Sequence, residues 1–517
     1  MFNGAAEFKT EPLRDMVAVG AVGPRRVRLW MRSRTPGRVA VRWRPENGEG
    51  EGGRVGFEIP ADNERDNTAG IELPGPEGGL TPARGYRFQV VHGDEERLLG
   101  EGRFETAPER PDQFPEMFSI GLMSCNQPFT PQGAFSDTDG RMLRAVRRCL
   151  RSHNAKYVLM VGDQMYSDYP PSLSLFNPDY LKTVAPGGQR DLKSCTPAEV
   201  RRLFHRHYRY FWNHPEWRAL QAEFPGYPIL DDHDIVDNWG SVAEHQGPRW
   251  RSVGEGARKA YEDYQHQRVA ASGVYLPDSF HYRFDYANTA TFVLDLRSER
   301  RAGKNGRLFS SRQLADLRAF LDNSGEKSVL FIVLSVPAIH LPRTLARMAA
   351  RLPKSPEDFS DRWSSGAHLR DRDRFLKILQ AHQARHPTQL LVLMSGDIHI
   401  ACVHSIRWSG GGPCFYQMIS SGITHAPGLL MQQASKMLIR MNHRISTMDG
   451  EAAGQVRLLR GTGIHRANPY SGLNLGLVEV HRKRETGETK LRFFLYGHNG
   501  DHPLCAYRSG LLDCNGA

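Results

Sequence analysis

Tyr157-Val158-Leu159-Met160-Val161-Gly162-Asp163-Gln164-Met165-Tyr166 is the stretch that decides the fold. Its first five residues form an apolar run of strand length, typical of a central strand with both faces buried. The run ends at Gly162 and Asp163, at the edge where open α/β sheets place their ligands. Asp163 and Tyr166 together offer hard oxygen donors for a multivalent cation. A turn-capping Asp163 and an ordinary half-buried Tyr166 are the alternative interpretation.

Four further strand-like runs are followed by cysteine, aspartate, histidine or arginine side chains. Strand ends of one sheet converge in space even when they are far apart in sequence, so these groups predict one shared metal site. The segments that follow the four runs are Ser124-Cys125-Asn126, Asp231-Asp232-His233-Asp234, Asp295-Leu296-Arg297 and Ser395-Gly396-Asp397-Ile398-His399.

The chain divides into an all-β part and an α/β part. Residues 1–107 contain short alternating runs such as 26–32 between Gly- and Pro-rich turns, which favours a β-sandwich of immunoglobulin or fibronectin type. Three prolines mark 108–116 as a linker. Residues 117–517 alternate strand and helix patterns. An apolar helical repeat at 140–152 separates two strand-like runs, which predicts a parallel βαβ unit.

Composition narrows the class of protein. The 517 residues carry a net charge of +11, which favours anionic partners. The seven cysteines are scattered and form no CxxC pair, as expected in a reducing compartment. No apolar run is long enough to span a bilayer, and residues 1–9 do not resemble an export signal. A cytoplasmic location is expected; a periplasmic or secreted one would follow if a leader had been removed.

The donor types indicate which metals the site would take. Asp163 is placed to bridge two cations, with Asp232 and Asp397 as further carboxylate ligands. The thiolate of Cys125 and the phenolate of Tyr166 are strong donors that suit iron. A cysteine at the end of a buried strand is more often a small core residue. Here its polar neighbours and the end of the strand favour a ligand.

Histidine and arginine side chains extend the same motifs. His399 lies two residues after Asp397, so in an extended segment both side chains point to one face. His233 follows Asp232 directly, which favours proton transfer over binding of the same metal. Arg297 offers a planar fork for phosphate oxygens. An ion pair with an acidic residue nearby in the sequence is the alternative for this arginine.

Phosphoester hydrolysis is the simplest reaction consistent with these residues. Two cations about 3.5–4 Å apart polarise a phosphoryl group, activate a bound water and neutralise the leaving oxygen. The sequence has no Gly-rich nucleotide loop followed by Lys, and no GxSxG elbow between a strand and a helix. The alternative function is non-catalytic binding of nucleic acid or anionic membranes through the basic surface. The arginines of 140–152 are more simply a solvated face, so nucleic acid is the less favoured partner.

These motifs, in this order, resemble those of the alkaline phosphatase D (PhoD-like) family of calcineurin-like metallophosphatases. The resemblance covers most of the chain and includes Asp237-Asn238 after the second acidic motif. It implies a four-layer αββα sandwich, related to that of purple acid phosphatases, behind an N-terminal β-sandwich. It also implies phosphomonoesterase or phosphodiesterase activity.

The resemblance also implies roles for single residues. Those that would hold an Fe3+-like metal are Cys125, Asp163, Tyr166 and His399. Those that would hold a second metal, Ca2+-like with Mn2+ or Zn2+ as alternatives, are Asp163, Asp232 and Asp397. The groups that would meet the substrate are His233, which protonates the leaving group, and Asn126 and Arg297, which contact phosphate. The pattern also accommodates a third metal. An isolated metal-binding histidine of the superfamily has no clear counterpart, and His340 is a weak candidate.

Two stretches, 341–354 and 429–444, combine apolar faces with Lys and Arg. Core packing or a lid is the favoured explanation, and a peripheral membrane helix that feeds lipid phosphodiesters is the alternative. The segment 417–425 is expected to line the pocket. The expected substrate is a phosphate ester of a small molecule, a lipid or a nucleotide, and the sequence indicates no oligomeric state.

Overall fold

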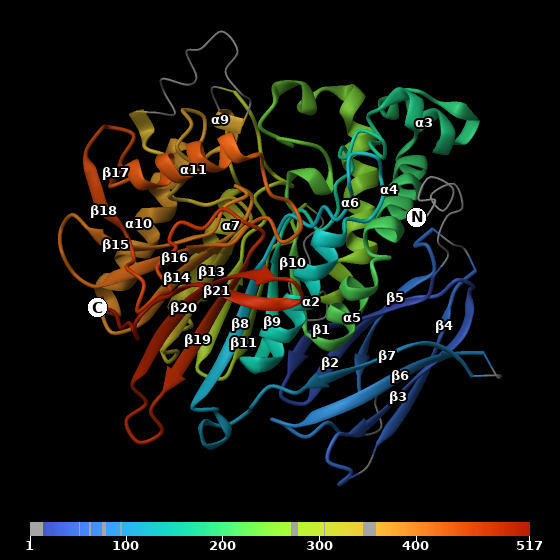
Figure 1. The fold of residues 1–517 in the computed structure, drawn as a ribbon, viewed down its shortest axis with the longest axis horizontal. Coiled ribbons are helices and arrows are strands. Elements are labelled where there is room, and N and C mark those ends of the chain that lie inside the picture. The colour runs from blue at the N-terminus through green and yellow to red at the C-terminus, as the bar shows by residue number, and fades with distance from the viewer. Residues whose placement is uncertain are drawn as a thin grey trace.

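The computed structural model describes residues 14–50, 52–61, 64–74, 79–93, 96–269, 278–303, 306–344 and 358–516. It is a mixed α/β protein with four β-sheets, which confirms the predicted class (Figure 1). The N-terminal strands lie together on one side of the molecule, and two larger sheets with their helices form the rest.

Two antiparallel sheets make up the N-terminal part, as the all-β pattern predicted. One sheet has the order β1-β2-β5, and the other has the order β4-β3-β6-β7. Alternating apolar residues of both sheets, such as Leu29 and Val41, meet in one hydrophobic cluster. The bounds are β1 Met16–Gly23, β2 Arg26–Arg32, β3 Gly37–Pro45, β4 Gly53–Ile59, β5 Thr68–Leu73, β6 Gly85–His92 and β7 Arg97–Glu105.

A six-stranded sheet with the order β10-β9-β8-β19-β20-β21 follows the linker. Its strands β8, β9 and β10 are parallel, and helix α2 (Asp137–Ser152) connects the first two, which confirms the predicted βαβ unit. The hydroxyl of Ser136 accepts the backbone N–H of Asp139 and caps this helix. The bounds are β8 Met117–Met123, β9 Ala155–Val161, β10 Gly226–Ile229, β19 Leu475–Arg482, β20 Thr489–Asn499 and β21 His502–Arg508.

The second large sheet has eight strands in the order β11-β12-β13-β14-β16-β15-β18-β17. Four neighbouring strands, β12, β13, β14 and β16, are parallel, so their carboxyl ends lie along one edge. The bounds are β11 Tyr282–Tyr286, β12 Thr289–Val293, β13 Val329–Leu334, β14 Leu390–Ser395, β15 Cys402–Trp408, β16 Cys414–Ile419, β17 Arg444–Ser446 and β18 Ala452–Leu458.

Alternate residues of the central strands explain their continuous apolar runs. Val392 and Met394 of β14 join the cluster that contains Leu477 of the six-stranded sheet. Leu391 and Leu393, on the opposite face of β14, join a second cluster with residues of α7 (Ser311–Asp322) and α10 (Leu369–Arg385). Each face of the strand therefore has its own apolar partner, so no polar alternation is required.

Helix α6 and the turn η7 link the N-terminal strands to the rest of the chain. Trp30 of β2 donates from Nε1 to the carbonyl of Asp263 at 2.7 Å, and Arg268 donates to the carbonyl of Val19 at 2.9 Å. The helix bounds are α3 Pro178–Val184, α4 Pro197–Phe211, α5 Pro215–Glu223, α6 Arg251–Tyr264, α9 Asp358–Asp361 and α11 Leu429–Met441. Short 3-10 turns are η1 Pro111–Gln113, η2 Pro186–Gly188, η3 Leu192–Ser194, η4 Asp232–Asp234, η5 Ala243–Gln246, η6 Pro248–Trp250 and η7 His266–Arg268.

One of the two amphipathic stretches is a helix, but its apolar face is not in the core. Within α11 only Ile439 is buried, so the interpretation of 429–444 as core packing is wrong for its outward side. Most of the other stretch, 345–354, lies outside the described residues. No helix in the described part of the chain is long and apolar enough to cross a bilayer.

Candidate metal centre

The predicted site residues stand on loops that follow strands β8, β9, β12 and β14, and on the turn η4 after β10. Two glycines let these loops touch. A Cβ at Gly162 would lie 2.3 Å from the Cβ of Asp231, and one at Gly396 would lie 2.2 Å from the Oγ of Ser124. Both distances are far below van der Waals contact, so the strand ends meet only because glycine precedes the aspartate in each motif.

Four of the predicted metal residues have a left-handed backbone. Their φ angles are 59° for Cys125, 53° for Asp163, 68° for Asp397 and 51° for His399. Such a conformation is uncommon for residues other than glycine, costs about 1–3 kcal/mol each and occurs most often at functional sites. Left-handed non-glycine residues also occur elsewhere, for example at Asp66 and Ala83 in N-terminal turns, but each of the metal motifs around Cys125, Asp163 and Asp397 contains at least one.

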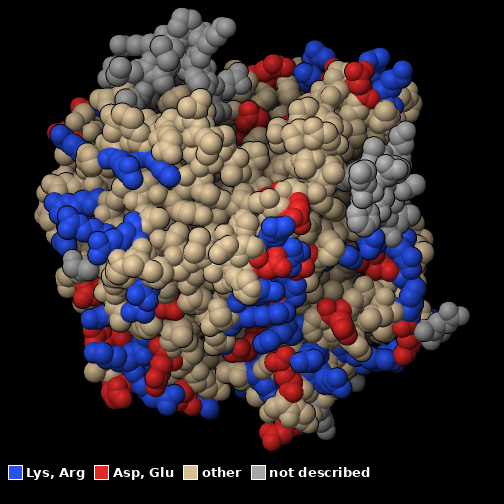
Figure 2. Space-filling view, in the orientation of Figure 1, with Lys and Arg blue, Asp and Glu red and all other residues tan. Residues whose placement is uncertain are grey.

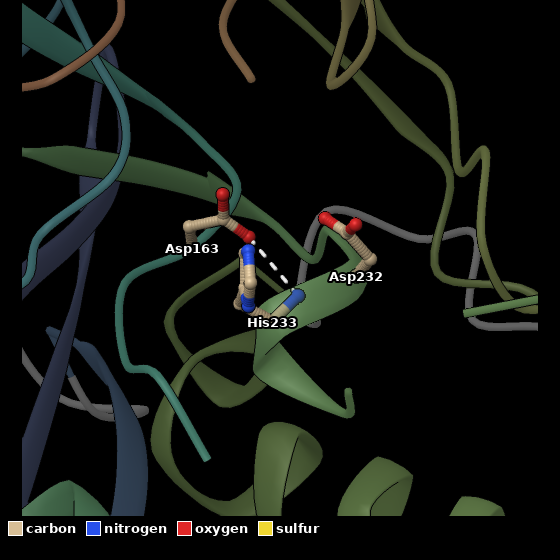
Figure 3. A group of neighbouring side chains, drawn as sticks. All are labelled: Asp163, Asp232 and His233. Carbon is tan, nitrogen blue, oxygen red and sulfur yellow. Dashed lines mark hydrogen bonds between the residues drawn. The ribbon is translucent and has the colours of Figure 1, made fainter. Parts of the chain in front are cut away.

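Asp163 lies at the centre of the cluster, with 1% of its surface exposed. The Cys125 thiol donates to its Oδ2 at 3.3 Å, and the Tyr166 hydroxyl donates to the same oxygen at 3.5 Å. The backbone N–H of His233 donates to Oδ1 at 3.3 Å. Figure 3 shows the Asp163 carboxylate beside the His233 ring, with Asp232 close by. Three separate motifs thus meet on one carboxylate.

Two groups of possible ligand atoms lie side by side. Asp163, Asp232 and His233 each offer an atom within 4.8 Å of the others, and so do Asp231, Asp232 and Asp397. Asp232 belongs to both groups, which makes them neighbours. Asp231 received no ligand role from the sequence. It is the N-cap residue of the turn η4, and its carboxylate lies in the second group.

Burial gives this cluster the electrostatics of a metal site. The pKa of Asp163 is raised well above its ordinary value, first by burial and then by Cys125, Asp232 and Asp231. Burial also raises the pKa of the Cys125 thiol and of the Tyr166 hydroxyl. A bound cation reverses these directions, because it stabilises the charged form of each donor. The donor set and its crowding therefore fit a multivalent metal.

His233 has the surroundings of a proton donor. Its Nδ1 lies 2.8 Å from Oδ1 of Asp168, and its ring stacks on Tyr166 with 4.3 Å between centroids. Burial acts to lower the pKa of His233, but the carboxylates of Asp168, Asp232 and Asp163 outweigh it and raise that pKa well above its ordinary value. Asp168 was missed by sequence reasoning because it lies outside the quoted motifs.

The two predicted phosphate contacts are buried and already bonded. The Asn126 amide donates to the carbonyl of Gln164 at 3.3 Å and accepts from the Thr424 hydroxyl at 3.1 Å. Arg297 is fully buried, and its guanidinium contacts three carboxylates. These belong to Asp231, Asp232 and Asp361, none of which is its neighbour in the sequence.

Two residues that the motifs did not include lie beside the predicted ligands. Arg362 forms an ion pair with Oδ2 of Asp397, and 14% of its side chain is exposed. His425 packs against His399 and Tyr166, with ring centroids 4.5 and 5.5 Å apart. Burial, with smaller effects of nearby histidines, lowers the pKa of His425 to about 2.

The sequence pointed to the position of His425 but not to that of Arg362. The segment 417–425 was expected to line the pocket, and His425 does lie among the predicted ligands. Arg362 follows α9 and is in no motif, so no local signal pointed to it. His340 is not in either group of ligand atoms among the described residues, and its carbonyl accepts from Asn442.

Comparisons with known proteins identify relatives of this chain in sequence and in fold. The model of the PhoD-like phosphatase family matches residues 120–462, more than half of the chain. A solved structure of PhoD superposes with a TM-score of 0.63 at 16% identity, covering 96% of this chain and 92% of that one. An uncharacterized protein of Saccharomyces cerevisiae, YGR266W, is 22% identical over 325 residues. That match covers 48% of this chain and 45% of the yeast protein, so the chain spans less than half of this relative.

Proposed function

Since this chain belongs to the PhoD-like phosphatase family, we propose that it hydrolyses phosphomonoesters, phosphodiesters or both at a site for two metals. The family implies a metal-dependent phosphoesterase with phosphate-ester substrates. The observation that carries the finer proposal is the meeting of Cys125, Tyr166 and η4 on the single buried carboxylate of Asp163.

The donor types support an assignment of each metal. We assign Cys125, Asp163, Tyr166 and His399 to an Fe3+-like ion, because thiolate and phenolate stabilise a strongly Lewis-acidic metal. Asp163, Asp232 and Asp397 offer only oxygen donors, which suits Ca2+, with Mn2+ or Zn2+ as substitutes. Such metals, when bound, polarise the phosphoryl group and activate a water. Asp231 is an additional candidate ligand, because its carboxylate lies in the second group.

Side chains that hold no metal would position the phosphate and supply a proton to the leaving group. His233 is held by Asp168 through Nδ1, which leaves Nε2 as the atom that donates a proton to the leaving oxygen. Asn126 holds the β8 loop against residues 164 and 424, and its contact with phosphate stays a prediction. Arg362 is a partly exposed cation that pairs with Asp397, and we propose that it binds a non-bridging phosphate oxygen.

The domain assignment is part of the same proposal. Residues 1–107 are a β-sandwich domain, 108–116 a linker and 117–517 a catalytic domain with four αββα layers. The shared cluster of the two large sheets, with α7 and α10 on the far face of one of them, supports this arrangement.

Elemental analysis of the purified protein, paired with hydrolysis assays, tests the proposal. We expect iron together with calcium or another divalent ion, and turnover of p-nitrophenyl phosphate or bis-p-nitrophenyl phosphate that EDTA abolishes. The ratio of the two activities gives the preference for monoesters or diesters. A metal-free protein that stays inert after reconstitution with iron, calcium, manganese and zinc would contradict the proposal.

Replacing His233 with glutamine is expected to act mainly on substrates with poor leaving groups. Loss of a general acid costs about 10²–10⁴-fold in rate when the leaving oxygen needs a proton. We therefore expect a large fall in kcat/KM for an alkyl phosphate and a smaller one for p-nitrophenyl phosphate. Asp168→Asn should reproduce part of this difference, because it releases Nδ1.

The control for this prediction is His153→Gln. His153 also pairs with a carboxylate, that of Glu479, but it caps α2 away from the cluster. The His153→Gln variant should hydrolyse the alkyl phosphate and p-nitrophenyl phosphate as fast as the wild type. Equal losses on both substrates for His233→Gln would mean that His233 does not protonate the leaving group.

A further inference from the structure

Helix α11 presents an apolar face that the described residues leave uncovered. Leu430, Met437 and Met441 lie on one side of the helix, at spacings of seven and four residues, and are 90%, 63% and 47% exposed. Leu429 and Met431 in the first turn are 77% and 61% exposed. Single exposed apolar side chains are common, whereas a contiguous apolar patch marks a binding surface.

The opposite face fixes α11 to the sheet that carries the site. Ile439 is 1% exposed and packs with Ile398, Ile400, Cys402 and Ile419. The hydroxyl of Ser471 and the side chain of Gln432 add a hydrogen bond of 3.0 Å. The helix is therefore held at one side and open at the other.

The helix lies next to the candidate metal centre. Ile398 and Ile400 beneath α11 alternate with the predicted ligands Asp397 and His399, so one short segment serves both. The helix also begins four residues after His425, whose ring contacts His399. A partner that binds α11 is consequently brought to the edge of the site.

The segment of the chain that contains α11 carries charge of only one sign. Residues 398–448 contain no aspartate or glutamate, and Lys436, Arg440 and Arg444 lie on or directly after the helix. Among the described residues, no carboxylate forms an ion pair with these three cations. Figure 2 shows a broad uncharged area over α11, with Lys and Arg side chains at its border. Such a surface complements an anionic, partly apolar partner.

We infer that α11 is an interfacial helix that docks the protein on an anionic phospholipid bilayer. An apolar face with basic residues beside it is the pattern of helices that lie in the plane of a membrane surface. A second copy of the chain fits less well, because a two-fold contact through α11 would bring Lys436 and Arg440 close to the same cations of the partner. Resting on the proposed function, this location assigns lipid phosphate esters as the substrate class.

Sedimentation of the full chain with vesicles tests this inference. We expect binding to vesicles of phosphatidylcholine and phosphatidylglycerol, and much weaker binding to phosphatidylcholine alone. The double variant Leu430→Ser, Met437→Ser should weaken binding by at least about tenfold, because each side chain loses the burial of its apolar surface in the bilayer. Lys436→Gln with Arg440→Gln should weaken binding to the anionic vesicles alone, by about fivefold per residue.

Leu98→Ser is the matched control, since Leu98 is also exposed, at 50%, but lies on β7 of the N-terminal part. It should bind vesicles like the wild type. Hydrolysis of soluble p-nitrophenyl phosphate should be unchanged in every variant, which shows that each one is folded. Vesicle binding is measured without turnover. A protein that hydrolyses p-nitrophenyl phosphate but does not bind vesicles would therefore contradict only this inference, and one that binds vesicles but is inactive would contradict only the proposed function.

Three results would overturn the inference. The first is a wild-type protein that does not bind anionic vesicles. The second is a Leu430→Ser, Met437→Ser variant that binds them as well as the wild type. The third is a dimer in light scattering that these substitutions dissociate, which would make α11 an interface between copies of the chain.

Discussion

Replacing Asp163 with asparagine is expected to abolish metal binding and turnover together. Asp163 accepts hydrogen bonds from Cys125, Tyr166 and the backbone of His233, and on the function proposed above its carboxylate would be shared by the two metals. An amide carries no charge, and metal catalysis of this type is worth several kcal/mol. We therefore expect a fall in kcat of at least about 10³-fold, with iron and the second metal both lost in elemental analysis.

The same variant should fold at least as well as the metal-free wild type. Because the pKa of Asp163 is raised, the folded metal-free protein holds this proton more tightly than the unfolded chain does. The metal-free wild type therefore loses stability as pH rises above the ordinary aspartate pKa of about 4, up to the raised pKa of the folded state. Asparagine does not titrate, so the variant does not lose this stability as pH rises. At pH 7 the melting temperature of the Asp163→Asn protein should therefore equal or exceed that of the metal-free wild type.

Asp139→Asn is the matched control for the aspartate chemistry. Asp139 is also buried, and burial raises its pKa to about 7, but it lies in the first turn of α2. This variant should keep metal content and turnover. Retention of either property in Asp163→Asn, with the fold intact, would disprove the bridging role.

Replacing Arg297 with methionine is expected to destabilise the protein more than any other single change in the site. Its guanidinium pairs with Asp231 and Asp361, and it lies 3.3 Å from Oδ1 of Asp232. Removing one partner of a buried ion pair leaves unpaired charge and costs about 3–5 kcal/mol. A lower urea midpoint should report this loss. Weaker binding of the second metal should accompany it, because Arg297 also orients the neighbouring carboxylates.

Arg362→Met is the comparison that separates positioning from phosphate binding. Arg362 is partly exposed, so its loss should change stability by only about 1 kcal/mol or less. If it binds phosphate, KM should rise by about ten- to a hundredfold, since a charge-assisted hydrogen bond contributes about 1.5–3 kcal/mol. A stable Arg297→Met protein with a raised KM, and an unaffected Arg362→Met protein, would restore the sequence-based prediction that Arg297 contacts phosphate.

Much of the site was predictable because its signals are local. The run from Tyr157 to Val161 is apolar throughout since both faces of β9 are covered, and that pattern is visible without knowing what covers them. Convergence of Cys125, Asp163 and Asp232 then follows from the rule that parallel strands end at one edge. The fold class and the identity of the central carboxylate were therefore available from the sequence.

Side-chain partners were decided by the tertiary structure alone. Arg297 does follow a strand, β12, yet the carboxylates that pair with it come from the β10–η4 segment and from α9. Arg362 and the exposed side of α11 also carried no distinguishing pattern, because an amphipathic helix has the same periodicity whether its apolar face meets a sheet or solvent. Periodicity reports only that a face is apolar, whereas the partner of that face, or of a buried charge, depends on segments distant in the sequence that pack beside it.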